Sequence, residues 1–509
     1  MQRDVRSRDN WALCLAQYLA KQNHIPLQVV YTLPLSPRLP VVPHGGRPED
    51  RDEDHPAKGD DDDDDGDGIP HVLELDRTER HGRFLLGGLK SVKEELQAKN
   101  VPLHILTPST QDQIGSTLVQ ACQSLHATCV ICDFSPLREI RSWMEDLVPP
   151  LLDEEQIPLI QVDAHNVVPV WFASPKRQVG ARTLRPKLNK LLPEFMTRFP
   201  PFLGNDKNMT LDFPMVDFAT LESTLHLDPS VPELEWATPG HDAAMKRFQE
   251  FLSSSSSPSQ GLSNFDSLRN DPNYAQVCSN LSPWINAGHI SFQRLALDVR
   301  ALKKYPNGTA SFIEEGIVRR ELSDNFLYYS RRDYDQLSTA AGWAQETLQV
   351  HAQDEREHVY SLEEFVAAET HDDLWNAAQM QLLQEGTMHG FLRMYWAKKI
   401  LEWTPSPDIA LRTALYLNDR YALDGNDPNG FTGVGWSIMG IHDQGWKERE
   451  VFGKIRFMNY AGCQRKFDVH GFVSKYPGAR DNAIRVQKAK GMPIQTATKK
   501  RKRKAAVKK

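Results

Sequence analysis

The sequence predicts a doubly wound α/β domain with a parallel sheet, followed by an all-helical domain. The first half of the chain alternates helical and strand patterns, which is typical of a parallel sheet with helices on both faces. From about Trp236 onward, apolar residues recur mainly at helical spacing. The 509 residues allow two or three domains, and 40% hydrophobic with 25% charged residues is ordinary for a globular protein.

The α/β domain is expected over residues 1–165. Its helices are predicted at Arg8–Gln22, Arg83–Lys99 and Gln111–Leu125, and its strands at Pro26–Leu33, Leu103–Thr107, Thr128–Phe134 and Pro158–Asp163. Such a domain usually opens with a strand, yet here MQRDVRSRDN leads directly into a helix. We therefore expect the sheet to lack its first strand.

Residues 166–235 are rich in Pro and Leu with few periodic stretches, which predicts a long connector between the domains. The helical domain is expected over residues 236–485. Its strongest amphipathic stretches are Asp242–Leu252, Trp284–Leu302, Ser311–Tyr328, Leu362–Leu383 and Met388–Trp403. Ser253–Ser257 is a flexible insertion in this domain.

The net charge of -7 is concentrated in two opposed runs. The insertion at residues 43–70 includes 12 acidic and 2 basic residues between Glu49 and Asp67, and we expect it to be disordered. The tail at residues 486–509 ends with 8 basic residues between Lys499 and Lys509, which is typical of nuclear import or nucleic-acid binding, although a plain solvated tail is almost as good an interpretation. The total charge therefore neither supports nor excludes DNA as a partner.

Six cysteines are too few for a disulfide scaffold, and no signal peptide precedes them, which indicates a reducing intracellular compartment. Cys129 and Cys132 form a C-x-x-C pattern inside a strand-like run, where residues three apart face opposite sides, so we expect no metal site there. No apolar stretch is long enough to span a membrane.

The segment Asp424–Asp468 has the composition of a nucleic-acid-binding site. Trp436 and Trp446 provide flat surfaces for stacking on bases, and cations among them can hold phosphates. The basic residues are Lys447, Arg449, Lys454, Arg456, Arg465 and Lys466. For each lysine taken singly, a solvated surface residue without a function is the better interpretation.

Three motifs in this segment resemble the class II cyclobutane pyrimidine dimer photolyases of the photolyase/cryptochrome family. They are N-D-x-Y-x-L-D-G-x-D-P-N-G, W-S-I-x-G-I-H-D-x-G-W and F-G-K-I-R-x-M-N-Y-A-G-C, and the likeness extends over nearly the whole chain. In that family a hydrophobic strand comes immediately before the residues that match Met1–Asp4. The resemblance therefore implies a truncated start that removes an inner strand of the sheet.

The resemblance implies that the helical domain holds FAD, reduced in the active form. Taken alone, S-x-x-S-P at Ser279–Pro283 reads as a helix start with an N-cap serine, which can also hold a phosphate. In the family this loop grips the FAD diphosphate, and Arg393 pairs with an aspartate, here Asp424, beside the flavin ring. Asn418 matches an asparagine near the reactive flavin nitrogen, where its carboxamide can turn to donate or accept. The cofactor-binding set implied is Arg269, Asn270, Ser279, Asn280, Leu281, Ser282, Arg393, Asn418 and Asp424.

Three tryptophans are implied as an electron ladder. Trp396 and Trp403 are seven residues apart and share one helix face. Trp375 would lie roughly 31 Å from Trp396 on one continuous helix, so we expect Gln384–Thr387 to break the helix and let Trp375 fold back between them. The family pattern assigns Trp396 as proximal, Trp375 as middle and Trp403 as distal. Without the resemblance, core packing would be the better interpretation.

For the substrate, Glu315 matches a glutamate that hydrogen-bonds the thymine edges, while Met394 and Trp436 would wall the pocket. Trp446 and Arg456 match residues that fill the bubble in the duplex and contact phosphates; the DNA-binding set also includes Arg449, Lys454 and Lys466. The function implied is light-driven repair of pyrimidine dimers in double-stranded DNA by a nuclear, monomeric enzyme. An antenna chromophore of unknown identity is possible. A cryptochrome-like photoreceptor and a non-catalytic damage-binding protein remain the alternatives.

Overall fold

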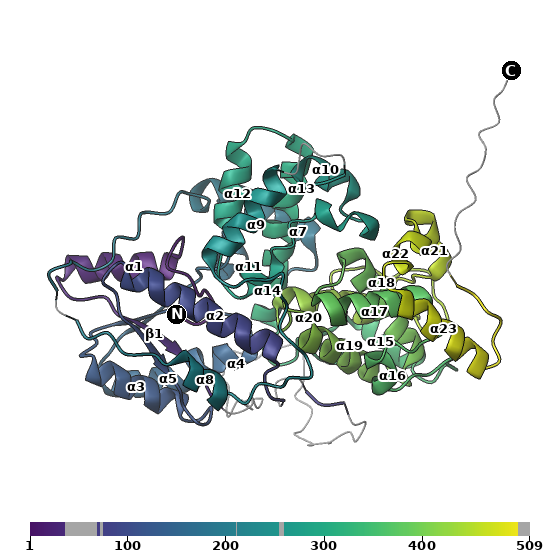
Figure 1. The fold of residues 1–509 in the computed structure, drawn as a ribbon, viewed down its shortest axis with the longest axis horizontal. Coiled ribbons are helices and arrows are strands. Elements are labelled where there is room, and N and C mark those ends of the chain that lie inside the picture. Colours follow the sequence, from purple (N-terminus) through teal and green to yellow (C-terminus); the bar gives the residue numbers. More distant parts are fainter. Residues whose placement is uncertain (36–68, 72–74, 210, 254–258, 497–509) are drawn as a thin grey trace.

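The computed structural model describes residues 1–35, 69–71, 75–209, 211–253 and 259–496. Figure 1 shows an α/β part at one end of the molecule and two groups of helices beyond it. The acidic insertion predicted at residues 43–70 falls almost entirely outside the described residues, as do most of the Ser253–Ser257 insertion and the last part of the basic tail.

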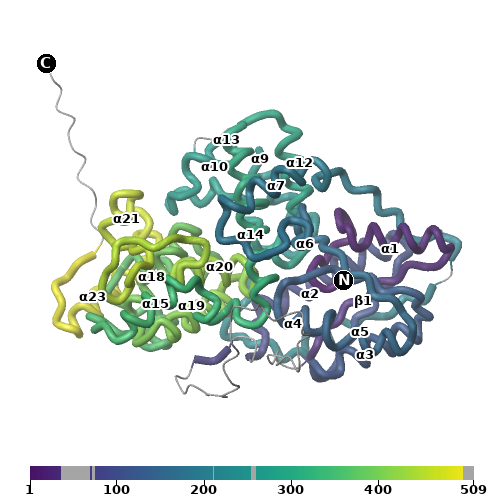
Figure 2. The backbone as a smooth tube through the Cα atoms, turned by 180° about the vertical axis from the view of Figure 1, so that it is seen from behind, coloured from purple at the N-terminus to yellow at the C-terminus, as the bar shows by residue number. Residues whose placement is uncertain are grey.

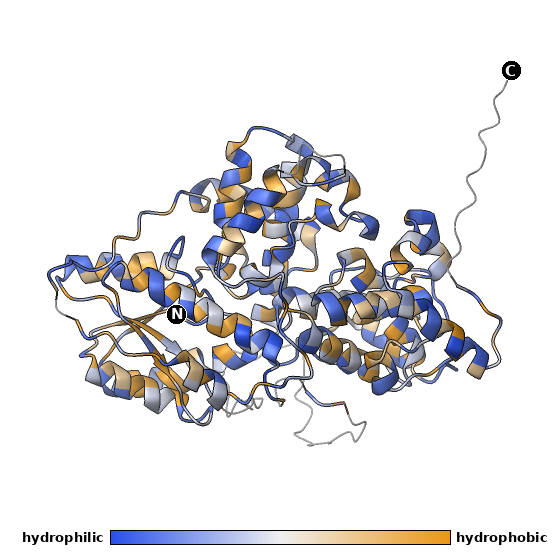
Figure 3. Ribbon diagram, in the orientation of Figure 1, coloured by the Kyte–Doolittle hydropathy of each residue, from blue (hydrophilic) through white to orange (hydrophobic). Residues whose placement is uncertain are grey.

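The N-terminal part contains four parallel strands, one at each predicted position. Strand β1 (Val29–Thr32) pairs with β2 (Leu103–Leu106), and β3 (Val130–Asp133) pairs with β4 (Leu159–Val162). The helices are α1 (Trp11–Gln22), α2 (Glu79–Gln97), α3 (Ile114–Ser124), α4 (Arg138–Arg141), the π-helical turn η3 (Ser142–Leu147) and α5 (Val148–Glu154). Apolar residues predominate in the strands (VVYT, LHIL, VICD and LIQV), and much of the chain between the helices of this part is orange in Figure 3. The predicted parallel α/β architecture is confirmed.

The four strands form two separate two-stranded sheets. Among the described residues no strand precedes α1, and none pairs with the facing edges of β1 and β3. A cavity of about 520 Å³ lies between these edges. The helices still begin where side chains cap them: Asn10 accepts a hydrogen bond from the main-chain N–H of Leu13 at the start of α1, and Thr78 accepts one from that of His81 at the start of α2.

The predicted connector contains three helices, α6 (Val170–Ala173), α7 (Ala181–Phe195) and α8 (Phe218–Thr224). The connector has more regular structure than its few periodic stretches suggest, because α7 buries Leu184 and Leu188 in a core with the first helical group. Pro186 and Pro193 lie inside α7, and prolines at interior positions conceal a helical pattern in the sequence.

The first helical group comprises α9 (His241–Ser253), α10 (Leu262–Leu268), the 3₁₀ helix η5 (Pro272–Val277), α11 (Ser282–Asn286), α12 (Phe292–Ala301) and α13 (Pro306–Ile313). The continuous helix predicted at Trp284–Leu302 is wrong, because α11 and α12 are separated at Gly288. Gly288 has a φ of +72°, and a Cβ there would stand 2.2 Å from the carbonyl oxygen of Arg3. The N-terminal segment therefore passes directly over this break.

The second helical group, which Figure 2 shows beside the first, surrounds a larger core. It comprises α14 (Arg320–Tyr329), η7 (Leu337–Thr339), α15 (Gly342–Val350), α16 (Leu362–Val366), α17 (Asp373–Glu385), α18 (Gly390–Trp403), α19 (Pro407–Tyr421), α20 (Pro428–Met439), α21 (Tyr460–Lys466), α22 (Val469–Val473) and α23 (Pro477–Ala489). The π-helical turn η6 (Glu314–Arg319) leads into α14 and buries Ile317 and Val318 in the core of the first group. The single helix predicted at Leu362–Leu383 is wrong. It is two helices, because Ala368 adopts a φ of +55° and Asp372 caps a new start at α17.

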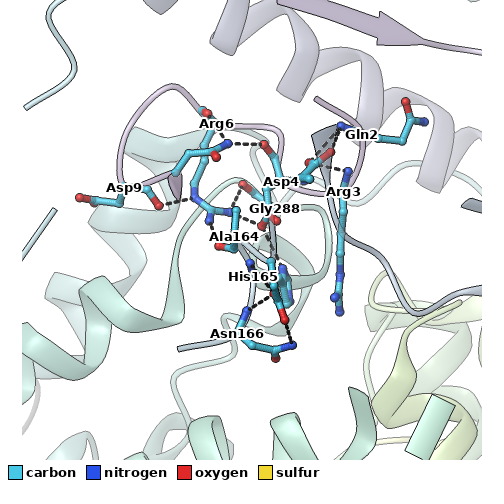
Figure 4. Close-up of polar contacts among 12 residues, drawn as sticks. Gln2, Arg3, Asp4, Arg6, Asp9, Ala164, His165, Asn166 and Gly288 are labelled. Atoms are coloured by element: carbon cyan, nitrogen blue, oxygen red, sulfur yellow. Dashed lines mark hydrogen bonds and ion pairs between the residues drawn. The ribbon is translucent and has the colours of Figure 1, made fainter. Parts of the chain in front are cut away.

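The N-terminal segment, residues 1–10, is held by a buried polar cluster (Figure 4). The carboxylate of Asp133, at the end of β3, accepts hydrogen bonds from the main-chain N–H groups of Gln2, Arg3 and Asp4 at 2.6–3.0 Å. The Arg3 guanidinium pairs with Asp324 of α14 at 2.7 Å, and both side chains are almost fully buried. The segment thus joins the α/β part to the helical part.

Removing the charge of Asp324 should destabilise the whole protein. Asp324→Asn leaves the buried Arg3 guanidinium without its counter-ion, and breaking a buried pair in this way costs about 3–5 kcal/mol. The loss is read from chemical denaturation of the full-length protein. Asp242→Asn is the matched control, because Asp242 pairs with Arg8 at 3.0 Å while it is 80% exposed, and it should cost less than about 1 kcal/mol. Equal losses of unfolding free energy in Asp324→Asn and Asp242→Asn would contradict a stabilising role for the buried Arg3–Asp324 pair.

Candidate functional site

Helices α17 and α18 form a hairpin that brings three tryptophans together. Helix α17 ends at Gly386, which adopts a left-handed conformation with φ +63°, so the chain reverses and α18 runs back beside α17. The predicted break at Gln384–Thr387 therefore falls at the right place. Trp375, Trp396 and Trp403 are all at most 2% exposed.

Trp375 lies between the other two tryptophans. Its ring is stacked on that of Trp396 with a centroid distance of 6.3 Å and an interplanar angle of 7°, and it meets the edge of Trp403 at 6.1 Å. The Trp375 indole N–H donates to the carbonyl of Trp396 at 3.0 Å, and the Trp396 indole N–H donates to Gln379 at 2.9 Å. These bonds fix the ring planes, and the spacing is short enough for stepwise electron transfer.

One turn before Trp396 on α18, Arg393 organises a polar group from three elements. Its guanidinium donates to Asp424 at 2.8 Å, to the carboxamide oxygen of Asn418 at 2.9 Å and to the Met388 carbonyl at 3.1 Å. Burial alone would raise the pKa of Asp424, but the charge and hydrogen bond of Arg393, together with a hydrogen bond from Ser282, lower it below its usual value. Asp424 is therefore an anion at neutral pH.

The carboxamide of Asn418 is fixed in one orientation. Its oxygen accepts from Arg393, while its amide nitrogen donates to Asp419 at 2.8 Å. Turning the group would place a donor against Arg393 and an acceptor against Asp419. A turn of this carboxamide with the redox state of a bound flavin, which the resemblance implies, would have to break both hydrogen bonds. Burial raises the pKa of Asp419 to about 6.

The loop at Ser279–Ser282 approaches this group from the first helical group. Leu281, which is buried, holds the cap position of α11, and Ser282 is the first helical residue; the assignment of Ser282 as the N-cap is therefore wrong by one position. The Ser282 hydroxyl bonds to Asp424 instead of capping the helix backbone. Asn280 adopts a φ of +53°, and the Ser279 carbonyl accepts from Arg247 at 3.2 Å.

Arg269, which ends α10, forms an ion pair with Glu315 at 2.8 Å. Glu315 lies in the π-helical turn η6, a distortion that is frequent at functional sites, and its side chain is 40% exposed. The pair joins two expected site residues that are 46 positions apart. Asn270, the next residue, is exposed.

The residues around Arg393 leave hydrogen-bonding capacity and open space for a ligand. The Nε of Arg269 is buried without a hydrogen-bond partner, so it has capacity left for a ligand. His389 caps α18, and burial lowers its pKa to about 4, so it is neutral. Beyond it, a Cβ on Gly390 would meet no atom within 4 Å, which indicates open space at the start of the helix.

A stack of cations and indoles forms a second part of the site. The buried ammonium of Lys398 lies 4.7 Å from the ring centroid of Trp436 and donates to the Ser437 carbonyl at 2.9 Å. The Arg456 guanidinium lies 5.3 Å from the same ring and 4.0 Å from that of Trp446. Asp443 holds Arg456 at 3.0 Å. The indole of Trp446 is thereby presented to solvent, with the residue 43% exposed.

Two other expected DNA-binding residues, Arg449 and Lys454, lie in the turn that follows Trp446. The Arg449 guanidinium covers the ring of Phe457 at 4.8 Å, and the chain turns back between Arg449 and Gly453 so that the Trp446 N–H reaches the Lys454 carbonyl at 2.8 Å. Arg449, Lys454 and Lys466 are exposed. Met394 is half-buried on α18, next to Arg393.

Sequence reasoning missed Lys398, Asp419, Asp443 and Gln379, each of which holds an expected site residue in place. One signal was available for Lys398, since a Lys-Lys pair in the apolar run of α18 is unusual. The other three are ordinary polar residues whose role follows only from three-dimensional contact. Within the described residues no helix is long and apolar enough to cross a bilayer, and no cluster of His, Cys, Asp or Glu has the composition of a metal site.

Comparison with known proteins identifies relatives that cover most of the chain. The DNA photolyase family matches residues 62–203. A deoxyribodipyrimidine photo-lyase of Potorous tridactylus is 44% identical over 476 residues, which are 93% of this chain and 80% of the relative. One from Arabidopsis thaliana is 41% identical over 482 residues, or 93% of this chain and 87% of the relative.

Among solved structures, a cryptochrome from Synechocystis sp. PCC6803 superimposes with a TM-score of 0.67 at 14% identity, covering 96% of this chain and 92% of that one. At this identity the likeness supports the fold alone.

The buried Lys398 should give the protein a measurable pH dependence. Burial lowers the pKa of Lys398 to about 7, against the effect of Asp443, whereas the unfolded chain keeps a value near 10.5. Between these values the unfolded state binds the extra proton, so stability should rise with pH by up to about 1.4 kcal/mol per unit. Lys398→Met should therefore be stabilised relative to wild type at pH 6 and lose about half of that advantage by pH 9, measured by denaturant unfolding.

Lys399→Met is the matched control on the same helix, since its ammonium pairs with Glu402 at 2.7 Å. A pH profile of Lys398→Met that runs parallel to wild type would contradict a depressed pKa.

Proposed function

Because this chain belongs to the DNA photolyase family, we propose that it repairs cyclobutane pyrimidine dimers in double-stranded DNA with the energy of light. The observation that carries the proposal is the continuous path from Trp403 through Trp375 to Trp396, one turn from the Arg393 group. If the three tryptophans only filled the core, an adjoining polar group with unused hydrogen-bonding capacity, as at Arg393, would not be expected beside them.

The family uses FAD, and we assign its binding to the residues around Arg393. Asn418, Arg393 and Asp424 would face the ring, while Ser279, Asn280, Leu281, Ser282, Arg269 and Asn270 would hold the remainder. The Arg393–Asp424 pair places one cation and one anion side by side, so the group can balance a change in ligand charge without a net charge of its own. When bound in its reduced form and excited by light, FAD supplies the electron that opens the cyclobutane ring and takes it back afterwards.

The substrate pocket is assigned to Glu315, Met394 and Trp436. A dimer has to leave the base stack to reach a site inside the protein, and its extrusion is cheap because its pairing is already damaged. Glu315 is held in position by Arg269, so its carboxylate is aimed before the substrate arrives. Trp436 is held by Lys398 and Arg456, which both lie against its ring, and it would give the pocket a rigid flat wall.

The DNA surface is assigned to the exposed residues beyond this wall. Trp446 has the exposure and support required to enter the gap that an extruded dimer leaves, since Arg456 lies against its ring. Arg449, Lys454, Arg456 and Lys466 would contact phosphates. We further propose that the protein acts as a monomer and that the basic run at residues 499–509 directs it to the nucleus. Loss of nuclear signal on deleting residues 499–509 from a fluorescent fusion would agree with this.

Repair is tested directly with the purified, FAD-reduced protein and an oligonucleotide duplex that contains one thymine dimer. We expect the absorbance of thymine at 260 nm to return under blue light and to stay constant in the dark. Dark binding to the dimer without recovery under light would favour a non-catalytic damage-binding protein. Flavin photochemistry with no binding to the dimer would favour a photoreceptor.

The tryptophan path should be separable from repair. We expect Trp396→Phe to block photoreduction of protein that carries oxidised flavin, because phenylalanine is much harder to oxidise, yet to leave repair by chemically reduced protein largely intact. Trp143→Phe removes an indole that is equally buried but lies in the α/β core, and it should photoreduce normally. Unimpaired photoreduction in Trp396→Phe would remove the role assigned to the path.

A further inference from the structure

The turn at residues 446–454, which includes much of the surface assigned to DNA, is fixed to α15 and to the segment that follows it. The hydroxyl oxygen of Thr347 accepts a hydrogen bond from the main-chain N–H of Lys454 at 3.0 Å. The carboxylate of Asp354 accepts one from the main-chain N–H of Val451 at 2.8 Å. The position of the turn therefore depends on the residues around the C-terminal end of α15.

His351 lies between Thr347 and Asp354 at this contact, where it caps the C-terminal end of α15. Its Nδ1 lies 2.6 Å from the carboxylate of Asp354, and its Nε2 lies 3.1 Å from that of Glu448 on the turn. A Cβ on Gly453 would stand 2.9 Å from the ring, so the turn packs directly against it. The imidazole thus bridges two carboxylates, one from each side of the contact.

The protonated imidazole suits this position better than the neutral one. An ionised carboxylate can only accept, so each ring nitrogen of His351 needs a proton of its own, whereas the neutral ring carries one. The C-terminal end of a helix also favours a cation. The hydrogen bond to Asp354, together with that to Glu448, raises the pKa of His351 above its usual value of 6.5, against the effect of burial.

The other charged groups around His351 support the same state. Hydrogen bonds from the main chain of Val451 and from His351 hold the pKa of Asp354 below its usual value, and the charge of Arg356 adds to this effect. The Arg356 guanidinium also donates to the main-chain carbonyl of His351 at 3.3 Å. Asp354 is therefore an anion at neutral pH and remains a partner for the protonated ring.

Glu448 interrupts a run of cations on the turn. It lies between Lys447 and Arg449 in the chain, and its side chain is 55% exposed. An anion at this place repels the phosphates that the neighbouring cations would contact, and a cation beside it cancels that repulsion. The charge of His351 therefore affects the approach of DNA as well as the position of the turn.

We propose that His351 is a positioning residue for DNA binding: its protonated ring holds the 446–454 turn against α15 and neutralises Glu448, and loss of the proton loosens the turn and leaves the charge of Glu448 facing DNA. This role rests on the proposed function, in which the turn binds dimer-containing DNA. Affinity for that DNA should be highest below the pKa of His351 and fall as the pH rises through it. Because phosphates add negative charge beside the ring, bound DNA should in turn raise this pKa.

The test measures the affinity of the full-length protein, in the dark, for a fluorescein-labelled duplex that contains one thymine dimer. Fluorescence anisotropy is recorded at pH 6.0 and pH 8.5 at one ionic strength. Between these pH values we expect the affinity of the wild type to fall by roughly threefold to tenfold more than that of a variant without the titrating ring. His24→Gln, at an exposed site in the α/β part, should keep the wild-type pH dependence.

Two substitutions of His351 fix its charge in opposite states. His351→Gln keeps a donor without a charge, and it should bind at both pH values about as weakly as the wild type does at pH 8.5. His351→Arg keeps the charge at both pH values, and it should bind about as tightly as the wild type does at pH 6.0. If His351 served only to pack the turn, both variants would be weakened and would keep the wild-type pH dependence.

Glu448 and Glu450 give a matched pair of substitutions on the turn itself. Both residues are exposed, so neither change should affect folding, and the carboxylate of Glu448 is the one that faces His351. Glu448→Gln should bind more tightly than the wild type at pH 8.5 and lose most of the pH dependence. Glu450→Gln should raise the affinity by a similar factor at both pH values and keep the pH dependence.

An equal fall in affinity with pH in the wild type and in His351→Gln would overturn the role of His351, and so would an equal response of Glu448→Gln and Glu450→Gln to pH. In either case, tight binding and light-driven repair by the wild type would leave the proposed function standing. A wild-type protein that binds the dimer duplex at neither pH would overturn the role of His351 and the proposed DNA surface together.

Discussion

The buried pair of Arg3 and Asp324 is the interaction on which the arrangement of the two parts depends. Two charges removed from water are tolerable only if each is matched and hydrogen-bonded, and here Asp324 also accepts from Asn166 at 2.8 Å. Arg3 belongs to a segment whose main chain is bound by Asp133 of β3. The α/β part and α14 are therefore held in register by groups that cannot separate without exposing a buried charge.

The same segment explains why the long-helix prediction failed at Gly288. Hydrophobic periodicity indicates which residues face a core. It carries no information about a distant segment of the chain that packs across the helix. Arg3 and Asp4 lie so close to Gly288 that only a residue without a Cβ fits, and Arg6 bonds the Gly288 carbonyl at 3.0 Å. Fold class, the four strands and α18 follow from local pattern, whereas helix breaks such as this one arise from tertiary contact.

The candidate site shows a similar division. The three tryptophans and their order could be predicted, because Gly386 marks the reversal of the chain and helical spacing fixes Trp396 against Trp403. The two hydrogen bonds that fix the Asn418 carboxamide could not be predicted, because one partner, Arg393, comes from another helix and the other, Asp419, from its own. Residues that bear chemistry carry a signal in sequence, while the residues that hold them are chosen by geometry alone.

Glu315 connects the site to the buried pair that joins the two parts. The chain is helical without interruption from η6 through α14, so Glu315 and Asp324 are nine residues, or roughly 14 Å, apart on one rigid element. Arg269 anchors one end of that element from the first helical group, and Arg3 anchors the other from the α/β part. The position of the carboxylate assigned to the substrate is thus set from both sides, and the N-terminal segment contributes to it without any contact with the site.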